Sequence, residues 1–377
     1  MDIEIVKDYM AALVYLLQRR KVLKRTELIK FIIESELFKT ENLTLFKQRF
    51  SENKVIKYSK LSINDLEVLL ENCGEYNIKI TMRGENNYPK LLNESSDAPL
   101  VIFYKGKIER LNESNINSLS VVGTRRMSSY GQRFIESEIP KLSLYNFCII
   151  SGLARGIDSC AHKVAIENSI FTVAVLAHGI DLIYPREHKS LRDSIAKEGV
   201  LISEHAPGVK PLKPYFPARN RIISALSNYT LVVEAGEKSG SLITAQFAAE
   251  QNRNVMTVPG SIYQDVSAGC NSLLKDGALL VRSAKDITDW MNIDFQMYSK
   301  NIDFQKEKFN NMSSMLIYDN LTLKIFNLLD KKAFNELELA NRLNLNISEL
   351  LIELTKLEAL GYIKRSGTKV FLTKSLN

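Results

Sequence analysis

The chain has 377 residues, of which 45% are hydrophobic and 25% charged. This composition is close to the average of globular proteins, and it excludes general disorder, a collagen-like repeat and a small disulfide scaffold. The length predicts two or three domains. Apolar stretches such as residues 11–17 are too short to cross a bilayer. With Asp2, Glu4 and Asp8 in place of a basic leader start, we expect a cytoplasmic protein without membrane contact.

Neither the cysteine positions nor the net charge identifies a ligand. Cys73, Cys148, Cys160 and Cys270 lie far apart, and their number permits two disulfides, although nothing indicates an oxidising compartment. One close pair, Cys160 and His162, is too small a set for tetrahedral zinc. We therefore predict no metal and no cofactor. The net charge of +7 allows an anionic partner without specifying one.

The first 60 residues contain neither glycine nor proline. Apolar residues recur there at helical spacing: Val6, Met10, Leu13 and Leu17. We predict a small helical domain over residues 1–80. The basic run at residues 19–21 is interpreted as a solvated helix end rather than a binding site.

The middle of the chain alternates short apolar runs with amphipathic stretches. The runs are rich in Val and Ile and lie at residues 119–122, 147–150, 171–176, 200–202, 230–233 and 254–258. Twelve of the 17 glycines fall between residues 119 and 283, where tight turns or ligand loops are expected. This pattern predicts an α/β domain over residues 81–290, with a mostly parallel sheet covered by helices on both faces.

The C-terminal part begins with a polar stretch, which we predict to be a linker over residues 291–316. Helical patterns follow at residues 321–329, 336–343 and 348–360, and residues 361–372 have the pattern of a β-hairpin. Three helices and a hairpin predict a winged-helix domain over residues 317–377.

Ligands of an open parallel sheet bind beyond the carboxyl ends of its strands. Small residues follow the predicted strands at positions 123–126, 151–158, 234–241 and 259–261. Their backbone N–H groups suit a phosphate, which Arg125, Arg126 and Arg155 could help to bind. One such loop alone would be an ordinary turn, but several together favour phosphate binding. Neither a dinucleotide fingerprint nor a Walker A loop is present.

Residues 210–221 combine prolines, cations and two aromatic rings, Tyr215 and Phe216. We predict a stiff, non-helical loop. Cations beside exposed rings are typical of single-strand binding, in which bases stack on aromatic faces. The alternative, that both rings cover the edge of the core, remains open.

Ser151, Asp158 and His162 superficially suggest a nucleophilic enzyme. However, the sequence lacks a GxSxG elbow. Asp158 is at a position where a carboxylate favours a helix start, and it could bond His162 one turn later. We therefore predict no catalytic residue.

Many motifs in order resemble the family of the DNA-processing protein DprA, also called Smf. They lie at residues 88–92, 98–106, 122–126, 151–158, 181–185, 216–223, 238–245, 258–261 and 269–271. The resemblance implies a Rossmann-like domain that binds single-stranded DNA without known catalysis. It also implies a homodimer that loads the RecA recombinase during natural transformation.

Carried over by position, the resemblance implies roles for individual residues. Phosphate contacts would come from Arg125 and from the loop with Ser151, Gly152, Arg155 and Gly156. Lys213 would contact the backbone, and Phe216 would stack on a base. A basic wall would consist of Arg219, Asn220 and Arg221, and a helix-start cradle of Ser239, Gly240 and Ser241.

Two alternatives remain open. Related sheets include phosphoribohydrolases, but residues 234–241 lack the PGGxGTxxE signature of those enzymes. A phage-defence relative with the same DNA chemistry cannot be separated from a transformation protein by sequence.

Overall fold

The computed structural model describes residues 2–293, 325, 328–329, 334–343, 345–359, 363–366 and 369–372. The chain divides into two compact units, Met1–Tyr298 and Ser299–Asn377. The predicted linker at 291–316 and the predicted helix at 321–329 lie mostly outside the described residues. No helix in the described ranges is both long and apolar enough to cross a membrane.

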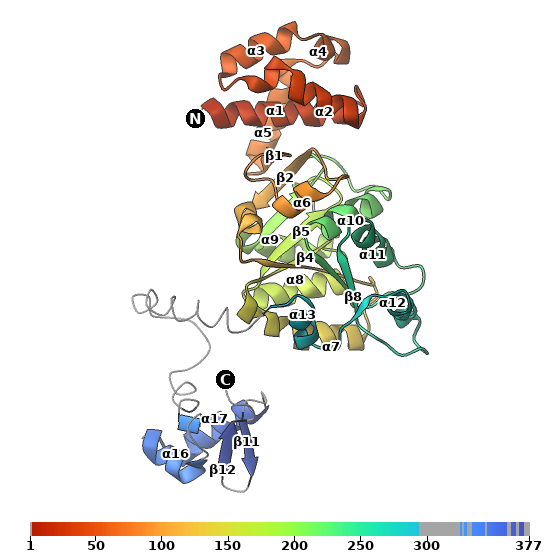
Figure 1. Ribbon diagram of the computed structural model, residues 1–377. Coiled ribbons are helices and arrows are strands. Elements are labelled where there is room, and N and C mark those ends of the chain that lie inside the picture. Colours follow the sequence, from red (N-terminus) through yellow and green to blue (C-terminus); the bar gives the residue numbers. More distant parts are fainter. Residues whose placement is uncertain are drawn as a thin grey trace. The chain divides into compact units, whose positions relative to one another are not determined.

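The chain begins with the predicted helical region, drawn in red and orange in Figure 1. Its helices are α1 (Asp2–Arg19), α2 (Arg25–Glu34), α3 (Leu43–Glu52), α4 (Lys54–Ser59) and α5 (Ile63–Glu75). The apolar positions that predicted α1 are all buried. Beyond the end of α1, Arg20 donates to the carbonyls of Ser59 and Lys60 and pairs with Asp65, so this part of the basic run braces the turn between α4 and α5.

A nine-stranded sheet follows, in the order β1-β2-β6-β5-β4-β3-β7-β8-β9. The predicted runs correspond to β3 (Asn117–Val122), β4 (Phe147–Ser151), β5 (Phe171–Leu176), β6 (Val200–Ser203), β7 (Tyr229–Val232) and β8 (Asn254–Thr257). Wherever two of these strands lie next to each other in the sheet, they pair in parallel. This confirms the mostly parallel α/β sheet.

Sequence patterns missed the outer strands β1 (Lys79–Met82), β2 (Val101–Gly106) and β9 (Leu279–Leu280). β1 and β2 extend the sheet in antiparallel fashion beyond β6, whereas β9 adds to β8 in parallel. A strand as short as β9 has too few residues to show an alternation of apolar and polar side chains, and its pairing partner is distant in sequence.

Helices cover both faces of the sheet, as predicted. One face packs against α7 (Ser129–Glu138), α8 (Ile157–Glu167) and α13 (Ala284–Trp290). The other packs against α6 (Lys90–Glu94), α10 (Tyr215–Ala225), α11 (Gly240–Glu250) and α12 (Asp265–Lys275). The remaining helix, α9 (Lys189–Glu198), shares a core with the N-terminal helices.

That shared core attaches the N-terminal helices to the sheet. The ring of Tyr15 on α1 meets Phe103 on β2 edge to face, with 5.0 Å between the centroids. The Tyr15 hydroxyl also accepts the Ala206 N–H at 3.1 Å. The helical region and the sheet therefore bury part of their apolar surface against each other.

The second unit has its own small core, which includes Leu339, Leu350, Leu354 and Val370. Its elements are β10 (Phe334–Asn335), α16 (Glu336–Leu343), α17 (Ile347–Ala359), β11 (Ile363–Ser366) and β12 (Lys369–Leu372), with strand order β10-β12-β11. The two helices and the hairpin occur where they were predicted. The winged-helix assignment of the whole unit stays a prediction.

The prediction of a non-helical loop over residues 210–221 is wrong from Tyr215 onward, because α10 begins there. Pro214 precedes the helix and Pro217 lies within its first turn. Backbone N–H groups in the first turn have no intrahelical partner, so proline costs no hydrogen bond at these positions. Proline therefore starts this helix rather than preventing it.

Candidate nucleic-acid interface

Two adjoining depressions open at the carboxyl ends of the central strands. The larger one, the outer groove, has a volume of about 480 Å³ and lies beside the loops that follow β3 and β7; it is lined by residues that include Gly123, Arg125, Lys213, Phe216, Asn220, Ser239, Gly240 and Ser241. The smaller one, the inner hollow, is lined by residues that include Gly152, Leu153, Arg155, Leu176, Ala177, His178 and Pro185. The two share Arg125, Ala154, Tyr184, Phe216 and Arg219, so they form one continuous surface.

The loop after β3 presents Arg125 to both depressions. It is held on two sides, because Thr124 donates its N–H to Glu234 O at 2.7 Å and its carbonyl accepts the Ile157 N–H at 3.2 Å. Gly156 has φ +77° and packs so closely against Thr124 that a Cβ there would collide with the carbonyl oxygen. Glycine at this position permits both the left-handed backbone and the close approach of the two loops.

Arg219, on α10, is buried and holds neighbouring segments together; it does not form part of an exposed basic surface. Its side chain is only 5% exposed, and Nη1 donates to Gly152 O at 2.7 Å and to Val175 O. These bonds tie the carboxyl ends of β4 and β5 to α10. Burial lowers the pKa of Arg219 to about 10, and the nearby Asp158 carboxylate opposes that shift.

Asp158 supports the loop after β4. Its Oδ2 accepts the N–H groups of Gly152 at 3.1 Å and Ala154 at 3.4 Å. Burial raises the pKa of Asp158, and the charge of Arg219 opposes this. The predicted bond from Asp158 to His162 is wrong, because His162 Nδ1 instead meets Thr172 Oγ1 at 2.7 Å.

The Ser151 hydroxyl is also engaged elsewhere: it is fully buried and donates to Val121 O at 2.6 Å. A serine–histidine–aspartate relay requires the imidazole to bond both the hydroxyl and the carboxylate. The contacts of Ser151, Asp158 and His162 do not form such a relay.

Aromatic rings and a cation meet where the two depressions join. The Arg125 guanidinium lies 5.5 Å from the ring centroid of Phe216. The ring of Tyr184 lies 5.4 Å from that of Phe216, tilted by 53°. Sequence reasoning did not name Tyr184 as a site residue. The available signal was an aromatic residue in the long connection between β5 and α9, beyond the carboxyl end of a central strand.

The start of α11 also lines the outer groove. Ser239 caps this helix by accepting the Ser241 N–H, and its hydroxyl lies 2.7 Å from that of Ser241. Asn220 Nδ2 donates to Gly240 O at 3.2 Å, which ties α10 to this helix start. The exposed Lys213 lines the same groove from the segment before α10.

The structure thus brings most of the predicted site residues together. The outer groove collects Arg125, Lys213, Phe216, Arg219, Asn220, Ser239, Gly240 and Ser241, and the inner hollow adds Gly152 and Arg155. Ser151 and Gly156 are not among the lining residues; the first is buried and the second packs against the loop after β3.

Arg221 lies away from both depressions. It pairs with Glu204 at 2.5 Å and donates to Asp97 O at 2.6 Å. Two residues along a helix are about 200° apart around its axis, so Arg219 and Arg221 cannot face the same side. A continuous wall of residues 219–221 is therefore not formed.

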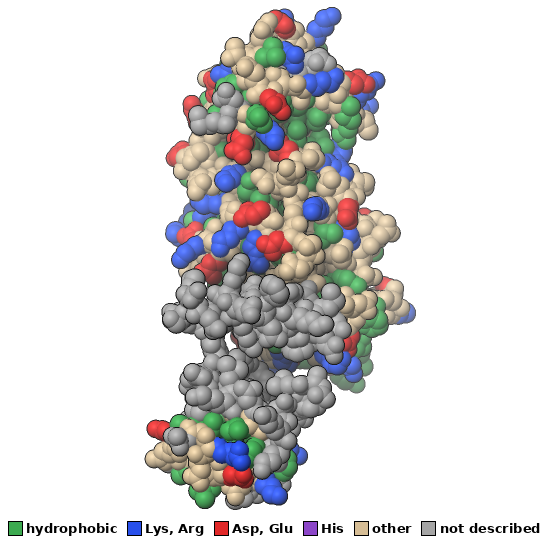
Figure 2. Space-filling model, turned by 60° about the vertical axis from the view of Figure 1, so that its left-hand side comes forward, with side chains coloured by type: hydrophobic (Ala, Val, Ile, Leu, Met, Phe, Trp, Pro, Cys, Tyr) green, Lys and Arg blue, Asp and Glu red, His purple; other side chains and the backbone are tan. Residues whose placement is uncertain are grey.

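The charges elsewhere are mixed. On the face shown in Figure 2, Lys and Arg side chains alternate with Asp and Glu, and neither sign dominates. Within the described residues, no group of three or more His, Cys, Asp or Glu side chains could hold a metal ion.

Fold and site together define an α/β protein with an open, mostly parallel sheet and a ligand groove at its carboxyl edge. The chain belongs to the family of DNA recombination-mediator protein A, whose sequence model matches residues 79–292. This confirms the resemblance drawn from the motifs.

Individual relatives agree with this assignment. The chain is 44% identical over 200 residues to the DNA processing protein DprA of Streptococcus pneumoniae, covering 53% of this chain and 70% of the relative. It is 42% identical over 200 residues to DprA of Bacillus subtilis, covering 53% and 67%.

Two solved structures are also similar. The crystal structure of DprA from Streptococcus pneumoniae matches with a TM-score of 0.63 and 34% identity, over 74% of this chain and 97% of that one. DNA processing protein A from Helicobacter pylori, a structure described for its single-stranded DNA binding mode, matches with a TM-score of 0.51 and 27% identity, over 57% and 95%.

Proposed function

We propose that this protein binds single-stranded DNA in the outer groove without making or breaking covalent bonds. The observation that carries the proposal is the convergence of Arg125, Lys213, Phe216 and the start of α11 on one groove. The description of the Helicobacter pylori relative supports the same ligand.

Each part of the groove suits one part of an unpaired strand. Arg125 and Lys213 are exposed cations and would contact phosphates. The start of α11 adds backbone N–H groups and the positive end of a helix dipole. The Phe216 ring would stack on a base, which a duplex would keep inside its own stack.

We further propose that the protein acts as a homodimer in the cytoplasm and loads RecA onto the bound strand. Membership in the recombination-mediator family supports this role. A mediator has to hold the strand through contacts that are reversible, and a groove built on phosphate contacts and stacking meets that need.

A salt titration with fluorescent oligo-dT tests the binding. If about five phosphates are contacted, the log–log slope of affinity against salt should be near −3.5 on single strands. Lys213→Ala should weaken binding to all sequences alike and flatten the slope by about 0.7. Phe216→Ala should weaken binding with little change in slope, because stacking releases no counterions.

Lys163→Ala is the matched control, because Lys163 is an exposed lysine on α8 that pairs with Glu167 and lines neither depression. It should bind like the wild type. Equal affinity for blunt duplex and oligo-dT would contradict the proposal. Release of free base from nucleoside monophosphates would support a phosphoribohydrolase instead.

A further inference from the structure

The ends of α1 and α4 form an exposed surface, the basic corner, that has no role in the binding described so far. It consists of Arg19, Lys21, Lys57, Tyr58 and Lys60, all of which are exposed. We propose that the basic corner is a second single-strand-binding surface, which the strand held in the outer groove reaches by continuing past the start of α10. This inference rests on the proposed function and extends it, because it gives the N-terminal helices a part in the binding of longer strands.

The positive charge of the chain is concentrated around this corner. Residues 19–60 contain twelve Lys and Arg but only five Asp and Glu, an excess that equals the net charge of the whole chain. Within the described residues, the four cations of the corner form no ion pair. The nearby Asp65 is already paired with Arg20 at 3.1 Å, so it does not neutralise them. A surface of unpaired cations attracts a polyanion.

Arg20 holds the two halves of the corner next to each other. Its Nη1 donates to the carbonyl of Ser59 at 3.4 Å and to that of Lys60 at 3.1 Å, which fixes the end of α4 against the end of α1. The flanking Arg19 and Lys21 stay exposed. The corner is therefore one defined surface of the folded protein, and its cations are not scattered over independent helices.

The basic corner adjoins the segment that leads into the outer groove. Arg19 lies one turn after Tyr15 on the same face of α1, and the Tyr15 hydroxyl accepts the Ala206 N–H at 3.1 Å. The ring of His205 stacks on that of Tyr215 at the start of α10, with centroids 4.2 Å apart and planes tilted by 31°. Burial lowers the pKa of His205 to about 4, and the charge of the neighbouring Arg19 adds to this shift.

The segment between the corner and the groove is itself basic. Lys213 and Phe216 lie on either side of Tyr215, and both line the outer groove. Lys210 is a further exposed cation, and residues 205–233 contain no Asp or Glu. In Figure 1, α1 runs from the N-terminus toward the side on which α10 lies. A strand that leaves the groove in this direction therefore passes exposed lysines.

Two carboxylates contact the segment, but both are engaged by the protein. Asp181 accepts the Gly208 N–H at 2.9 Å, and Glu204 pairs with Arg221 at 2.5 Å. Both carboxylate side chains are half-buried, whereas the lysines of the segment are exposed. The charge offered to a strand along this path is therefore positive.

Tyr58 favours an unpaired strand over a duplex. Its side chain is 82% exposed, and within the described residues it makes no hydrogen bond and no ring contact. Lys54 and Lys57 lie on the same short helix and are exposed as well. An exposed ring beside cations can stack on a base while the lysines contact phosphates. A duplex keeps its bases in its own stack, so it could use the lysines but not the ring.

A short and a long oligo-dT separate the corner from the groove. Single-strand-binding modules cover about 4–16 nucleotides, so an oligomer of about 8 nucleotides occupies the groove and one of about 40 extends beyond it. Tyr58→Ala should weaken binding of the long oligomer by about 5-fold or more, the least expected from loss of one base–aromatic stack. It should leave binding of the short oligomer unchanged, and Tyr58→Phe should bind both like the wild type.

The lysines are tested by the salt dependence of binding. Lys57→Ala should flatten the log–log slope of the long oligomer by about 0.7, because one phosphate contact is lost. The slope of the short oligomer should not change. Lys213→Ala should weaken binding of both oligomers, because Lys213 lines the groove itself.

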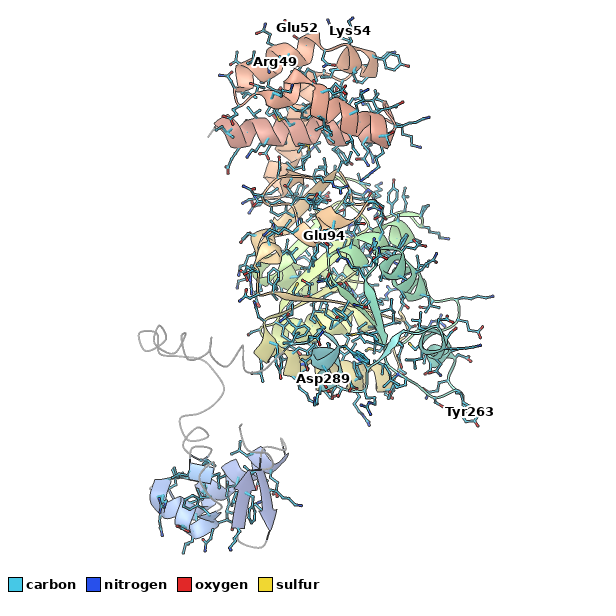
Figure 3. The ribbon with its side chains drawn as sticks, viewed as in Figure 1. Arg49, Glu52, Lys54, Glu94, Tyr263 and Asp289 are labelled. Carbon is cyan, nitrogen blue, oxygen red and sulfur yellow. The ribbon has the colours of Figure 1, made fainter. Side chains whose placement is uncertain are left out.

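Tyr263→Ala and Lys163→Ala are the matched controls. Tyr263 is 91% exposed on the loop between β8 and α12, at the opposite end of the first unit from Lys54 on α4 (Figure 3). Lys163 is exposed on α8 and pairs with Glu167. Neither substitution should change the binding of either oligomer.

A fluorescence measurement reports on Tyr58 directly. The chain has one tryptophan, Trp290. In a Trp290→Phe background, Tyr58→Trp should lose emission when the long oligomer binds, as the indole stacks on a base, and should keep it with the short one. Tyr263→Trp should keep its emission with both.

The inference is overturned if Tyr58→Ala and Lys57→Ala bind the long oligomer as the wild type does, or if they lose affinity equally for the short one. Equal loss of affinity for a blunt duplex would also overturn it, since the corner would then be a duplex site. In each case the proposed function survives as long as Lys213→Ala still weakens binding of both oligomers. If the wild type bound neither oligomer, the proposed function itself would be lost.

Discussion

The guanidinium of Arg219 lies directly against the α-carbon of Gly152. A Cβ at residue 152 would come within 2.5 Å of Nη2 and 2.7 Å of Nη1. The same Nη1 donates to the Gly152 carbonyl, across 67 positions of sequence. The loop after β4 and the helix α10 are thus locked together by one buried side chain, and both contribute to the depressions at the sheet edge.

Gly152→Ala should break this lock. The added methyl group would displace Arg219 from the carbonyls of Gly152 and Val175 and leave a buried charge with fewer acceptors. We expect a loss of about 1–3 kcal/mol in the free energy of unfolding, measured by urea denaturation. Oligo-dT affinity should fall as well.

Gly74→Ala provides the comparison for that experiment. Gly74 lies in α5, and a Cβ there would meet nothing within 4 Å. Alanine should leave stability unchanged or raise it by up to about 1 kcal/mol. Equal stability of the Gly152→Ala and wild-type proteins would show that the contact with Arg219 is not a structural constraint.

Glu187→Gln should strengthen binding of single strands. Glu187 pairs with Arg155 at 2.5 Å on the rim of the inner hollow, and both side chains are at least half exposed. Removing the carboxylate frees Arg155 for a phosphate and removes a repulsive charge. We expect an affinity gain of about 2- to 5-fold and a salt slope steeper by up to about 0.7.

Stability should hardly change in that variant, since exposed pairs contribute about 0–1 kcal/mol. Glu167→Gln is the control, because Glu167 forms an exposed pair with Lys163 outside both depressions. If both substitutions raised affinity equally, the gain would come from net charge and not from Arg155.

Glu234→Ala should destabilise the loop that carries Arg125. The buried Glu234 carboxylate accepts the Ser128 N–H at 2.9 Å and the Ser128 hydroxyl, immediately before α7. Alanine would leave these half-buried donors without their acceptor, and we expect a cost of about 1 kcal/mol by urea denaturation. Glu237→Ala, at an exposed position of the same loop, should change stability by less than about 0.5 kcal/mol.

Asp8→Asn should make the protein more stable at neutral pH. Burial raises the pKa of Asp8 from 3.8 to about 6, helped by the charges of Glu85 and Glu4. The folded protein therefore binds this proton more tightly than the unfolded chain. The resulting stabilisation is fully present below pH 3.8 and is lost as the pH rises through about 6.

Asparagine is uncharged throughout this range. The variant should exceed the wild type by about 1–3 kcal/mol at pH 7.5, and the difference should shrink toward pH 4.5. Asp65→Asn should instead be less stable than the wild type at pH 7.5, because the bond from the Ser62 backbone N–H lowers the pKa of Asp65 and so stabilises its ionised form in the folded protein. A difference that did not depend on pH would argue against titration of Asp8.

The central strands and several of the helices could be predicted from the sequence. Val6, Met10, Leu13 and Leu17 repeat with the period of a helix, and the Val- and Ile-rich runs have strand length, because burial on one or both faces imposes these local patterns. Placing Arg125 and Ser239 at one edge followed from the same reasoning, since carboxyl ends of neighbouring parallel strands meet there.

Only the tertiary structure decided which side chains share the groove. Arg219 and Arg221 are both basic and close in sequence, yet the packing of α10 against the sheet buries one beside Gly152 and directs the other to Glu204. Tyr184 lines both depressions, where its ring packs against those of His178 and Phe216. Such relationships depend on contacts between distant segments, and local periodicity carries no information about them.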